Sequence, residues 1–262
     1  MTKVRVIGPG RAGQSLMGAL RAVGGYEVLG ALGRGDVLNG AGAGADVVVI
    51  ATPDAAVPAT AAAIDPVDSA VVVHLSGSLG LDLLGRHPRR GALHPLVPLP
   101  DPERGSERLR SGVGFAVAGD PVVRSMALAL GGRVVEVDDQ SRATYHAAAT
   151  IAANHVVALM GQVERVAGAS GLPLDVFAGL VRAAVDDAMA LGPEAALTGP
   201  AARGDWGTIA RHRAVLADMA QGSSELEAYD AMVDLARRLV DEPVPVVDPA
   251  PVVATPSVRD AA

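Results

Sequence analysis

The first half of the chain alternates short apolar runs with longer alanine-rich stretches. The apolar runs are continuous, which is typical of strands buried on both faces of a parallel sheet. The stretches between them are predicted to be helices, notably residues 12–23 and 55–64. This alternation predicts an α/β fold with a doubly wound, mostly parallel sheet. The predicted strands are Lys3–Gly8, Glu27–Leu32, Asp46–Ala51, Ala70–Leu75, Gly91–His94, Val113–Ala118 and Val134–Val137.

The pattern changes near Asp138, and almost no strand signal follows it as far as Val240. Residues 141–171 are predicted to form one long helix, because Gly171 closes the segment and Pro173 follows. Further helices are expected at 173–191, 205–219 and 223–240. We therefore predict a sheet domain at 1–138, an all-helical domain at 139–241 and a disordered tail at 242–262, which is rich in Pro, Val and Ala.

A glycine motif, G-x-G-x-x-G, lies where the first strand meets the first helix, with Gly8, Gly10 and Gly13 in VIGPGRAG. In that context the motif indicates a Rossmann-like dinucleotide-binding turn. Gly8 allows a tight turn, Gly10 lets the backbone approach a pyrophosphate, and Gly13 lets the helix pack against the strand. The helix N-terminus favours phosphate binding, so Arg11 and Ala12 are also expected at the cofactor. The alternative is a structural turn without a ligand.

Arg34 is predicted to follow the second strand, where NAD-binding proteins usually place an acidic residue. An arginine suits the 2′-phosphate of NADP, so NADP is favoured over NAD, although a solvated surface charge is the alternative. The loops after the third and fourth strands should lie at the same edge of the sheet. We expect Thr52, Pro53 and Ser76 of these loops to contact the cofactor, with ordinary turn roles as the alternative.

Three further motifs occur later in the chain than the glycine motif. They are GALHPLVPLP, YHAAATIAANHVVAL and LTGPAARGDWGTIARH. Together with VIGPGRAG they resemble the Rossmann-like NADP oxidoreductases that carry a C-terminal domain of unknown function. This family is similar to ketopantoate reductases, pyrroline-5-carboxylate reductases and other enzymes with a 6-phosphogluconate-dehydrogenase-like helical domain. The resemblance implies an NADP-dependent reductase, with ketopantoate reduction in pantothenate synthesis as one implied activity, and a homodimer through the helical domain.

The long helix lacks the lysine that ketopantoate reductases and 3-hydroxyacid dehydrogenases use there as proton donor, since Lys3 is the only lysine. His146, Thr150 and Asn154 recur at steps of four, which keeps them near one helix face. We expect His146 to act as general acid, Asn154 to bind the carbonyl or alkoxide, and Thr150 to contact substrate. His94 is the second acid candidate. The alternative is that His146 is structural and its neighbour Tyr145 packs in the core.

Arg203 and Thr208 of the third motif are further substrate candidates, because an arginine can clamp a carboxylate with two hydrogen bonds. A structural ion pair with Asp205 or a subunit contact is the alternative for Arg203. The chemistry that we expect is reduction of a small oxo acid. A cyclic-imine reductase of the pyrroline-5-carboxylate type and a non-catalytic NADP sensor or partner protein stay open as alternatives.

The composition narrows these possibilities. The formal net charge of −7 and the lack of basic runs make nucleic-acid or membrane binding a poor expectation. The absence of cysteine excludes disulfides and thiolate chemistry, and no His or acidic spacing predicts a metal site. No signal peptide or membrane-spanning run is recognised, so a cytoplasmic protein is expected.

Overall fold

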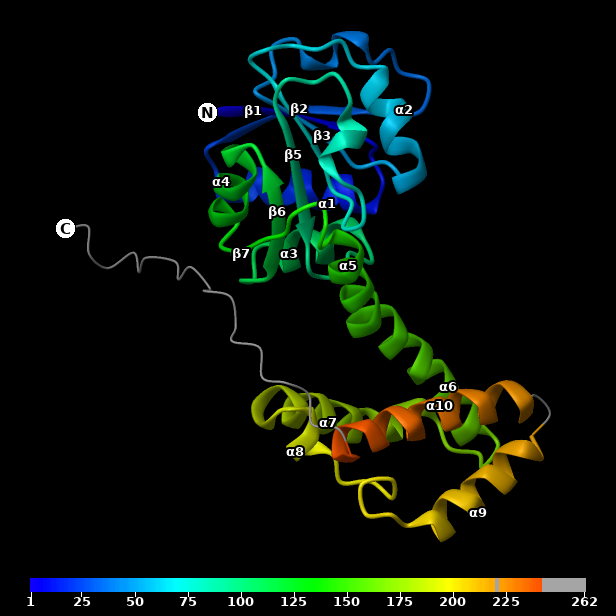
Figure 1. Ribbon diagram of the computed structural model, residues 1–262. Coiled ribbons are helices and arrows are strands. Elements are labelled where there is room, and N and C mark those ends of the chain that lie inside the picture. Colours follow the sequence, from blue (N-terminus) through cyan, green and yellow to red (C-terminus); the bar gives the residue numbers. More distant parts are fainter. Residues whose placement is uncertain (220–221, 242–262) are drawn as a thin grey trace. The chain divides into compact units, whose positions relative to one another are not determined.

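The computed structural model describes residues 1–219 and 222–241 (Figure 1). The predicted disordered tail, 242–262, lies outside the described residues. The described chain forms two compact units, of which the first is Met1–Ala153 and the second begins at Asn154. The division falls later in the chain than the boundary expected after residue 138.

The first unit contains one seven-stranded sheet. Its order is β2-β1-β3-β4-β5-β6-β7, and neighbouring strands are parallel except for the antiparallel pair β5–β6. The doubly wound, mostly parallel Rossmann-like sheet is therefore confirmed. The strands are β1 (Thr2–Ile7), β2 (Tyr26–Leu32), β3 (Val47–Ile50), β4 (Val71–His74), β5 (Arg90–Pro95), β6 (Gly114–Gly119) and β7 (Arg133–Glu136).

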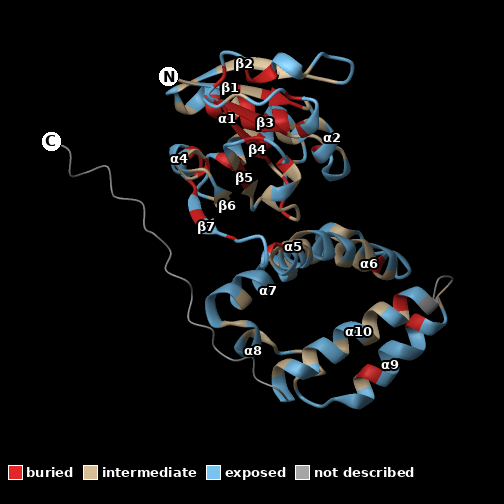
Figure 2. Cartoon of the chain, turned by 45° about the horizontal axis from the view of Figure 1, so that its top comes forward, coloured by how far each residue is buried: buried red, intermediate tan, exposed pale blue. Residues whose placement is uncertain are grey.

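Helices cover the two faces of this sheet. The α-helices of the unit are α1 (Arg11–Val23), α2 (Val57–Ala62), α3 (Pro102–Leu109), α4 (Pro121–Ala129) and α5 (Arg142–Thr150). Single 3₁₀ turns occur at η1 (Asn39–Gly42), η2 (Asp54–Ala56) and η3 (Leu81–Leu84). The central strands β3 and β4 are buried throughout, and separate apolar clusters pack on the two sides of the sheet (Figure 2).

Two helices of this unit, α3 and α4, are absent from the sequence prediction. Each begins with an aspartate that accepts a backbone hydrogen bond, followed directly by proline. Asp101 accepts from the N–H of Arg104 at 2.9 Å, and Asp120 accepts from the N–H of Val122 at 3.0 Å. An Asp cap with Pro in the first helical position is a recognised helix start, so the local signal was present.

The predicted single helix over 141–171 is wrong in detail. Helix α5 ends at Thr150, a π-helical turn η4 follows at Ile151–His155, and α6 runs from Val156 to Gly168. A π turn takes one residue more than an α turn before its hydrogen bond closes, and such turns are frequent at functional sites. Steps of four therefore do not keep residues on one face across this segment.

The second unit is entirely helical in its described residues. After α6 come η5 (Leu174–Phe177), α7 (Ala178–Leu191), α8 (Pro193–Ala196), α9 (Trp206–Ala217) and α10 (Gly222–Asp241). Arg165 of α6 pairs with the buried Glu225 of α10, their Nε and Oε1 atoms lying 2.5 Å apart. The described part of this unit has few buried apolar side chains, and pale blue dominates it in Figure 2. The buried apolar side chains among the described residues of this unit are Ala167, Ile209 and Leu216.

Candidate functional site

The glycine turn has the geometry that a dinucleotide fingerprint requires. Gly8 has a φ of 100°, and a Cβ built there would lie 2.8 Å from the carbonyl of Ala51. A Cβ built at Gly13 would lie 2.2 Å from the Gly8 carbonyl oxygen, so only glycine lets α1 pack this close to the turn. A Cβ at Gly10 meets nothing within 4 Å among the described residues. Two glycines are therefore fixed by packing, and the middle one faces open space.

The N-terminus of α1 is open to an anion. Gly10 is its N-cap, no side chain of the described residues caps it, and its first turn carries no acidic residue. The free N–H groups and the positive end of the helix dipole therefore have no built-in partner. Arg11 is exposed and Ala12 half-buried at this end of the helix. Their placement suits phosphate binding.

Arg34 is exposed in the turn that follows β2. The carboxylate of Asp36 accepts the N–H of Gly33 at 2.6 Å, which closes this turn. Asp36 therefore stabilises the turn, whereas the side chain of Arg34 is exposed to solvent. This arrangement agrees with the assignment of Arg34 rather than Asp36 to a cofactor phosphate.

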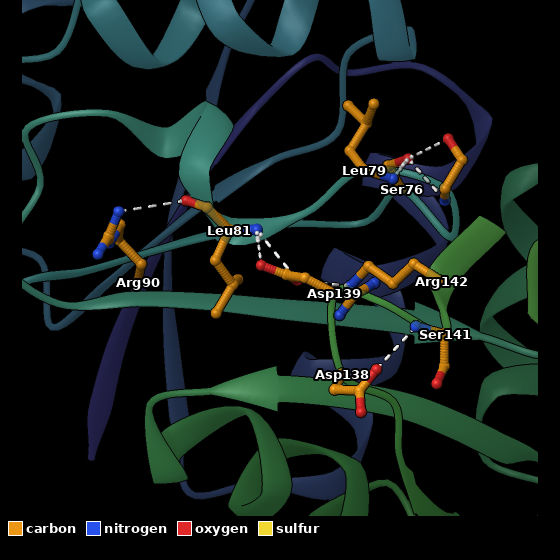
Figure 3. Close-up of polar contacts among 9 residues, drawn as sticks. Ser76, Leu79, Leu81, Arg90, Asp138, Asp139, Ser141 and Arg142 are labelled. Atoms are coloured by element: carbon orange, nitrogen blue, oxygen red, sulfur yellow. Dashed lines mark hydrogen bonds and ion pairs between the residues drawn. The ribbon is translucent and has the colours of Figure 1, made fainter.

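The loops after β3 and β4 are joined by a network of hydroxyl groups around Asp54. Ser76 Oγ donates to Asp54 Oδ2 at 2.7 Å, and Ser78 Oγ donates to the same oxygen at 2.8 Å. Ser76 Oγ also accepts the backbone N–H groups of Ser78 and Leu79, each at 3.2 Å (Figure 3). Ser76 thus shapes its loop. Pro53 is the N-cap residue that precedes the 3₁₀ turn η2.

A cluster of aromatic polar side chains lies beside this loop, and we name His94, Tyr145 and His146 the His–Tyr cluster. His94 Nδ1 is 2.6 Å from Tyr145 Oη, and the rings of His94 and His146 lie 5.9 Å apart between centroids. A Cβ built at Gly77 would lie 2.7 Å from His146 Cδ2 and 2.8 Å from His94 Cε1. The structure therefore brings together both imidazoles that the sequence singled out. Tyr145, predicted only as a packing residue, joins them.

Burial controls the ionisation of this cluster. It lowers the pKa of His94 to about 4, and the nearby charges of His146 and Arg142 act in the same direction. Burial also raises the pKa of Tyr145 to about 12. Both groups are therefore neutral near pH 7. Asp54 opposes the shift of His94 but does not overcome it.

Arg142, which no sequence pattern singled out, is the largest fully buried side chain of the described chain, at 1% exposure. Its Nε donates to Asp139 Oδ1 at 3.2 Å, while Nη1 and Nη2 have no partner among the described residues. Asp139 also accepts the N–H of Leu81 at 3.2 Å, so it lies between η3 and α5 (Figure 3). Asp138, one residue earlier, accepts the N–H of Ser141 at 2.7 Å.

His74 at the end of β4 is completely buried. Burial first, and the charge of Arg142 second, lower its pKa to about 4. Neither ring nitrogen has a partner of good hydrogen-bond geometry among the described residues. A neutral imidazole packed inside the sheet unit indicates a structural role for this histidine.

The remaining candidate residues for substrate contact and catalysis lie in α5, in η4 and around the start of α9. Thr150 is the last residue of α5 and half-buried, and Asn154 is exposed in η4, in the second unit. Arg203 donates to the carbonyl of Thr198. Thr208 Oγ1 donates to Asp205 at 2.7 Å in the cap of α9. These contacts give Arg203 a structural task in the loop before α9 and give Thr208 one in the first turn of α9.

No helix in the described ranges is long and apolar enough to cross a membrane. The same residues contain no group of three or more His, Cys, Asp or Glu side chains arranged to hold a metal ion.

The fold and the glycine turn define a Rossmann-like architecture followed in the chain by a helical unit. Residues 114–236 match the model of the family described as "Domain of unknown function (DUF2520)". The match begins at β6 in the sheet unit and extends to residue 236 in α10, and it agrees with the resemblance drawn from the sequence motifs. No curated protein is significantly similar to the chain.

Several solved structures share this fold. BF3122 from Bacteroides fragilis, provisionally named an NADP oxidoreductase, has a TM-score of 0.74 and 20% identity over 90% of this chain and 98% of its own. Protein TM1727 from Thermotoga maritima has a TM-score of 0.68 and 22% identity over 91% and 98%. Pyrroline carboxylate reductase from Plasmodium falciparum, solved with NADP bound, has a TM-score of 0.58 and 12% identity over 91% and 98%.

Proposed function

We propose that the protein is an NADP-dependent reductase of a small oxo acid. The observation that carries the proposal is the glycine turn, where Gly8 and Gly13 are fixed by packing and Gly10 leaves open space at an uncapped helix N-terminus. That is the environment that a pyrophosphate requires. The names of two solved structures with this fold, BF3122 and the NADP-bound pyrroline carboxylate reductase, support the choice of cofactor.

The reaction follows from the His–Tyr cluster. When bound, NADPH supplies a hydride to a carbonyl carbon, and the oxygen that gains negative charge needs a proton. His94 and His146 bring imidazole groups to Gly77, in the loop after β4 at the carboxyl edge of the parallel strands. Ligands of doubly wound folds bind outside this edge. We therefore propose that the proton comes from this cluster.

The remaining assignments are part of the same proposal. Asn154 hydrogen-bonds the developing alkoxide, and ketopantoate is one candidate substrate that the motif resemblance favours. The cofactor is held by Gly8, Gly10, Arg11, Ala12, Gly13, Arg34, Thr52, Pro53 and Ser76. The substrate is contacted by Thr150, Arg203 and Thr208.

A cyclic imine is the second candidate substrate. The name of the pyrroline carboxylate reductase with this fold favours it, because pyrrolines are cyclic imines. An imine nitrogen can arrive already protonated, so it places less demand on a proton donor. The two substrate classes therefore differ in how strongly they depend on the His–Tyr cluster.

A binding and turnover experiment tests the proposed function. Calorimetry should show tighter binding of NADPH than of NADH, and a panel of 2-oxo acids and cyclic imines should include compounds that oxidise NADPH. Binding of NADPH without turnover of any member would support a sensor or partner protein instead. Absence of binding would remove the cofactor assignment as well.

Replacing Arg34 should change the choice between cofactors. We expect Arg34→Ala to weaken NADPH binding by about 1.5–3 kcal/mol, the usual loss of one hydrogen bond to a charged group. NADH binding should change little, because NADH lacks the 2′-phosphate. Calorimetry of both cofactors on both proteins measures the difference. Equal affinity of the wild type for NADPH and NADH would contradict the assignment.

We also propose that the protein forms a homodimer through its helical unit. Helix α7 has no buried residue among those described. Its apolar side chains Leu180, Met189 and Leu191 are 70%, 84% and 62% exposed. A helix that is apolar on more than one side normally packs against other helices. With so few buried apolar side chains of its own, this unit needs a further surface to cover it, and a second copy would provide one.

Light scattering at micromolar concentration should give the mass of a dimer, whether residues 242–262 are present or removed. Met189→Asp should shift the protein toward the monomer, because a carboxylate at an apolar interface loses its hydration. Val37→Asp is the matched control, since Val37 is 79% exposed but lies in the sheet unit. A wild-type monomer would refute the proposal.

A further inference from the structure

Two tyrosine hydroxyls of the described chain contact a histidine nitrogen. Tyr145 Oη is 2.6 Å from His94 Nδ1, and Tyr229 Oη is 2.8 Å from His212 Nδ1. In both pairs the rings meet edge to face, at interplanar angles of 88° and 82°. The pairs differ in their surroundings, because the first lies in the sheet unit and the second in the helical unit.

The first pair lies against the loop after β4. Gly77 leaves no room for a Cβ, because one placed there would lie 2.9 Å from His94 Nδ1 and 2.7 Å from His146 Cδ2. The backbone of this loop therefore rests directly on the imidazoles. Its Asp54–Ser76–Ser78 network holds it in place. Tyr145 is thus held at the same edge of the sheet where the proposed reaction takes place.

The hydrogen bond can exist in two forms. Either the phenol donates to His94 Nδ1, or a protonated Nδ1 donates to the phenol oxygen. In the second form the Tyr145 proton points away from His94 and can reach another acceptor. His146, in comparison, has no hydrogen-bond partner among the described residues that would fix its ring.

We propose that Tyr145 is the catalytic proton donor and that His94 restores its proton. This inference rests on the proposed reductase function. As hydride adds to the carbonyl carbon, the π electron pair of the C=O bond moves to oxygen. The Oη–H bond of Tyr145 breaks and a new O–H bond forms on the substrate. His94 then gives its Nδ1 proton to the tyrosinate while Nε2 takes a proton from water, so one proton is consumed for each hydride.

The ionisation of the pair suits this sequence of steps. Tyr145 stays protonated because burial raises its pKa to about 12, yet it can protonate an alkoxide, which is a stronger base than a phenolate. His94 keeps one protonated and one free nitrogen at neutral pH, because burial lowers its pKa to about 4. The groups that act on it are His146, Arg142 and His74, which disfavour its charged form, and Asp54, which favours it.

Tyr145→Phe removes the hydroxyl and keeps the ring. We expect the hydride-transfer rate with NADPH and a 2-oxo acid to fall by about 10²–10⁴-fold, the usual contribution of a general acid. With 1-pyrroline, which can arrive protonated, the rate should fall far less. A purely structural role would lower both rates equally. The dissociation constant of NADPH should not change measurably, and Tyr229→Phe is the matched control that should leave every rate unchanged.

A second readout requires no turnover. In ¹⁵N-histidine NMR spectra of the full chain, Tyr145→Phe should shift the Nδ1 signal of His94, while Tyr229→Phe shifts that of His212. An unshifted His94 signal would show that the pair does not form and would overturn the inference.

The outcomes separate the inference from the function on which it rests. If the wild type reduces oxo acids but Tyr145→Phe keeps the rate within about threefold, Tyr145 is not the donor. A larger loss in His146→Ala than in Tyr145→Phe would assign the donor to His146. Turnover of imines alone would also overturn the inference, because no alkoxide forms. A protein that binds no NADPH would refute the proposed function itself.

Discussion

Asp139→Asn should destabilise the sheet unit by about 3 kcal/mol, because it leaves a buried guanidinium without a counter-charge. Arg142 is 1% exposed, its Nε pairs with Asp139, and its two terminal nitrogens have no partner among the described residues. The amide oxygen of the new side chain could still accept hydrogen bonds from Arg142 Nε and the N–H of Leu81, so the loss reports charge rather than geometry. The expected value lies at the lower end of the usual range because the Asp139 side chain is 48% exposed. Urea denaturation followed by circular dichroism measures the change.

The neighbouring carboxylate provides the control. Asp138→Asn keeps an acceptor for the N–H of Ser141, and this side chain faces no buried cation, so the change should stay within about 0.5 kcal/mol. The double variant Asp139→Asn with Arg142→Met should recover part of the stability, because the uncompensated charge is then gone. Equal losses in the two aspartate variants would contradict this account of the pair.

Gly13→Ala should both weaken the fold and abolish tight NADPH binding. The added methyl would lie 2.2 Å from the Gly8 carbonyl oxygen, and both atoms belong to the turn between β1 and α1. Helix α1 must move away from the strand to make room, at a cost of about 3 kcal/mol, the upper part of the range for overpacking. The N–H groups at its N-terminus would move with it, so NADPH affinity should fall by at least about tenfold.

Gly10→Ala separates the binding role from packing. A Cβ at Gly10 meets no described atom within 4 Å, so the free energy of unfolding should change by less than about 1 kcal/mol. The methyl would nevertheless occupy the space proposed for the pyrophosphate, and NADPH should bind more weakly. Calorimetry and denaturation on both variants give the comparison. Unchanged NADPH affinity in Gly10→Ala would place the cofactor elsewhere.

The sheet was predictable because its central strands are almost continuous apolar runs. The run at Asp46–Ala51, for example, corresponds to β3 at Val47–Ile50, where every residue is buried. The glycine spacing likewise located the turn before α1, since only glycine fits the positions of Gly8 and Gly13. The strands and the glycine turn each depend on residues close together in the sequence. Hydrophobic periodicity and the conformational freedom of glycine are therefore enough to predict them.

The π turn η4 and the contacts of the site were not predictable in the same way. The residues Ile151–His155 have no composition that distinguishes a π turn from an α turn. Tyr145 and His94 are 51 residues apart in the sequence. A local pattern on α5 therefore could not reveal that the two side chains form a hydrogen bond. Arg142 is charged, and no pattern in the sequence distinguishes it from a solvent-exposed arginine. Its burial depends on Asp139 and on tertiary packing that one sequence does not reveal.

The described residues of the helical unit form almost no apolar core, and this has a thermodynamic consequence for the proposed dimer. If a partner copy supplies most of the buried surface around Ala167, Ile209 and Leu216, folding of this unit and association become one equilibrium. Its melting temperature should then rise with protein concentration, while that of the sheet unit should not. Trp206, the only tryptophan, lies in the helical unit and stacks with Arg237, so its fluorescence would follow this transition separately. Dilution alone would then unfold one half of the molecule before the other.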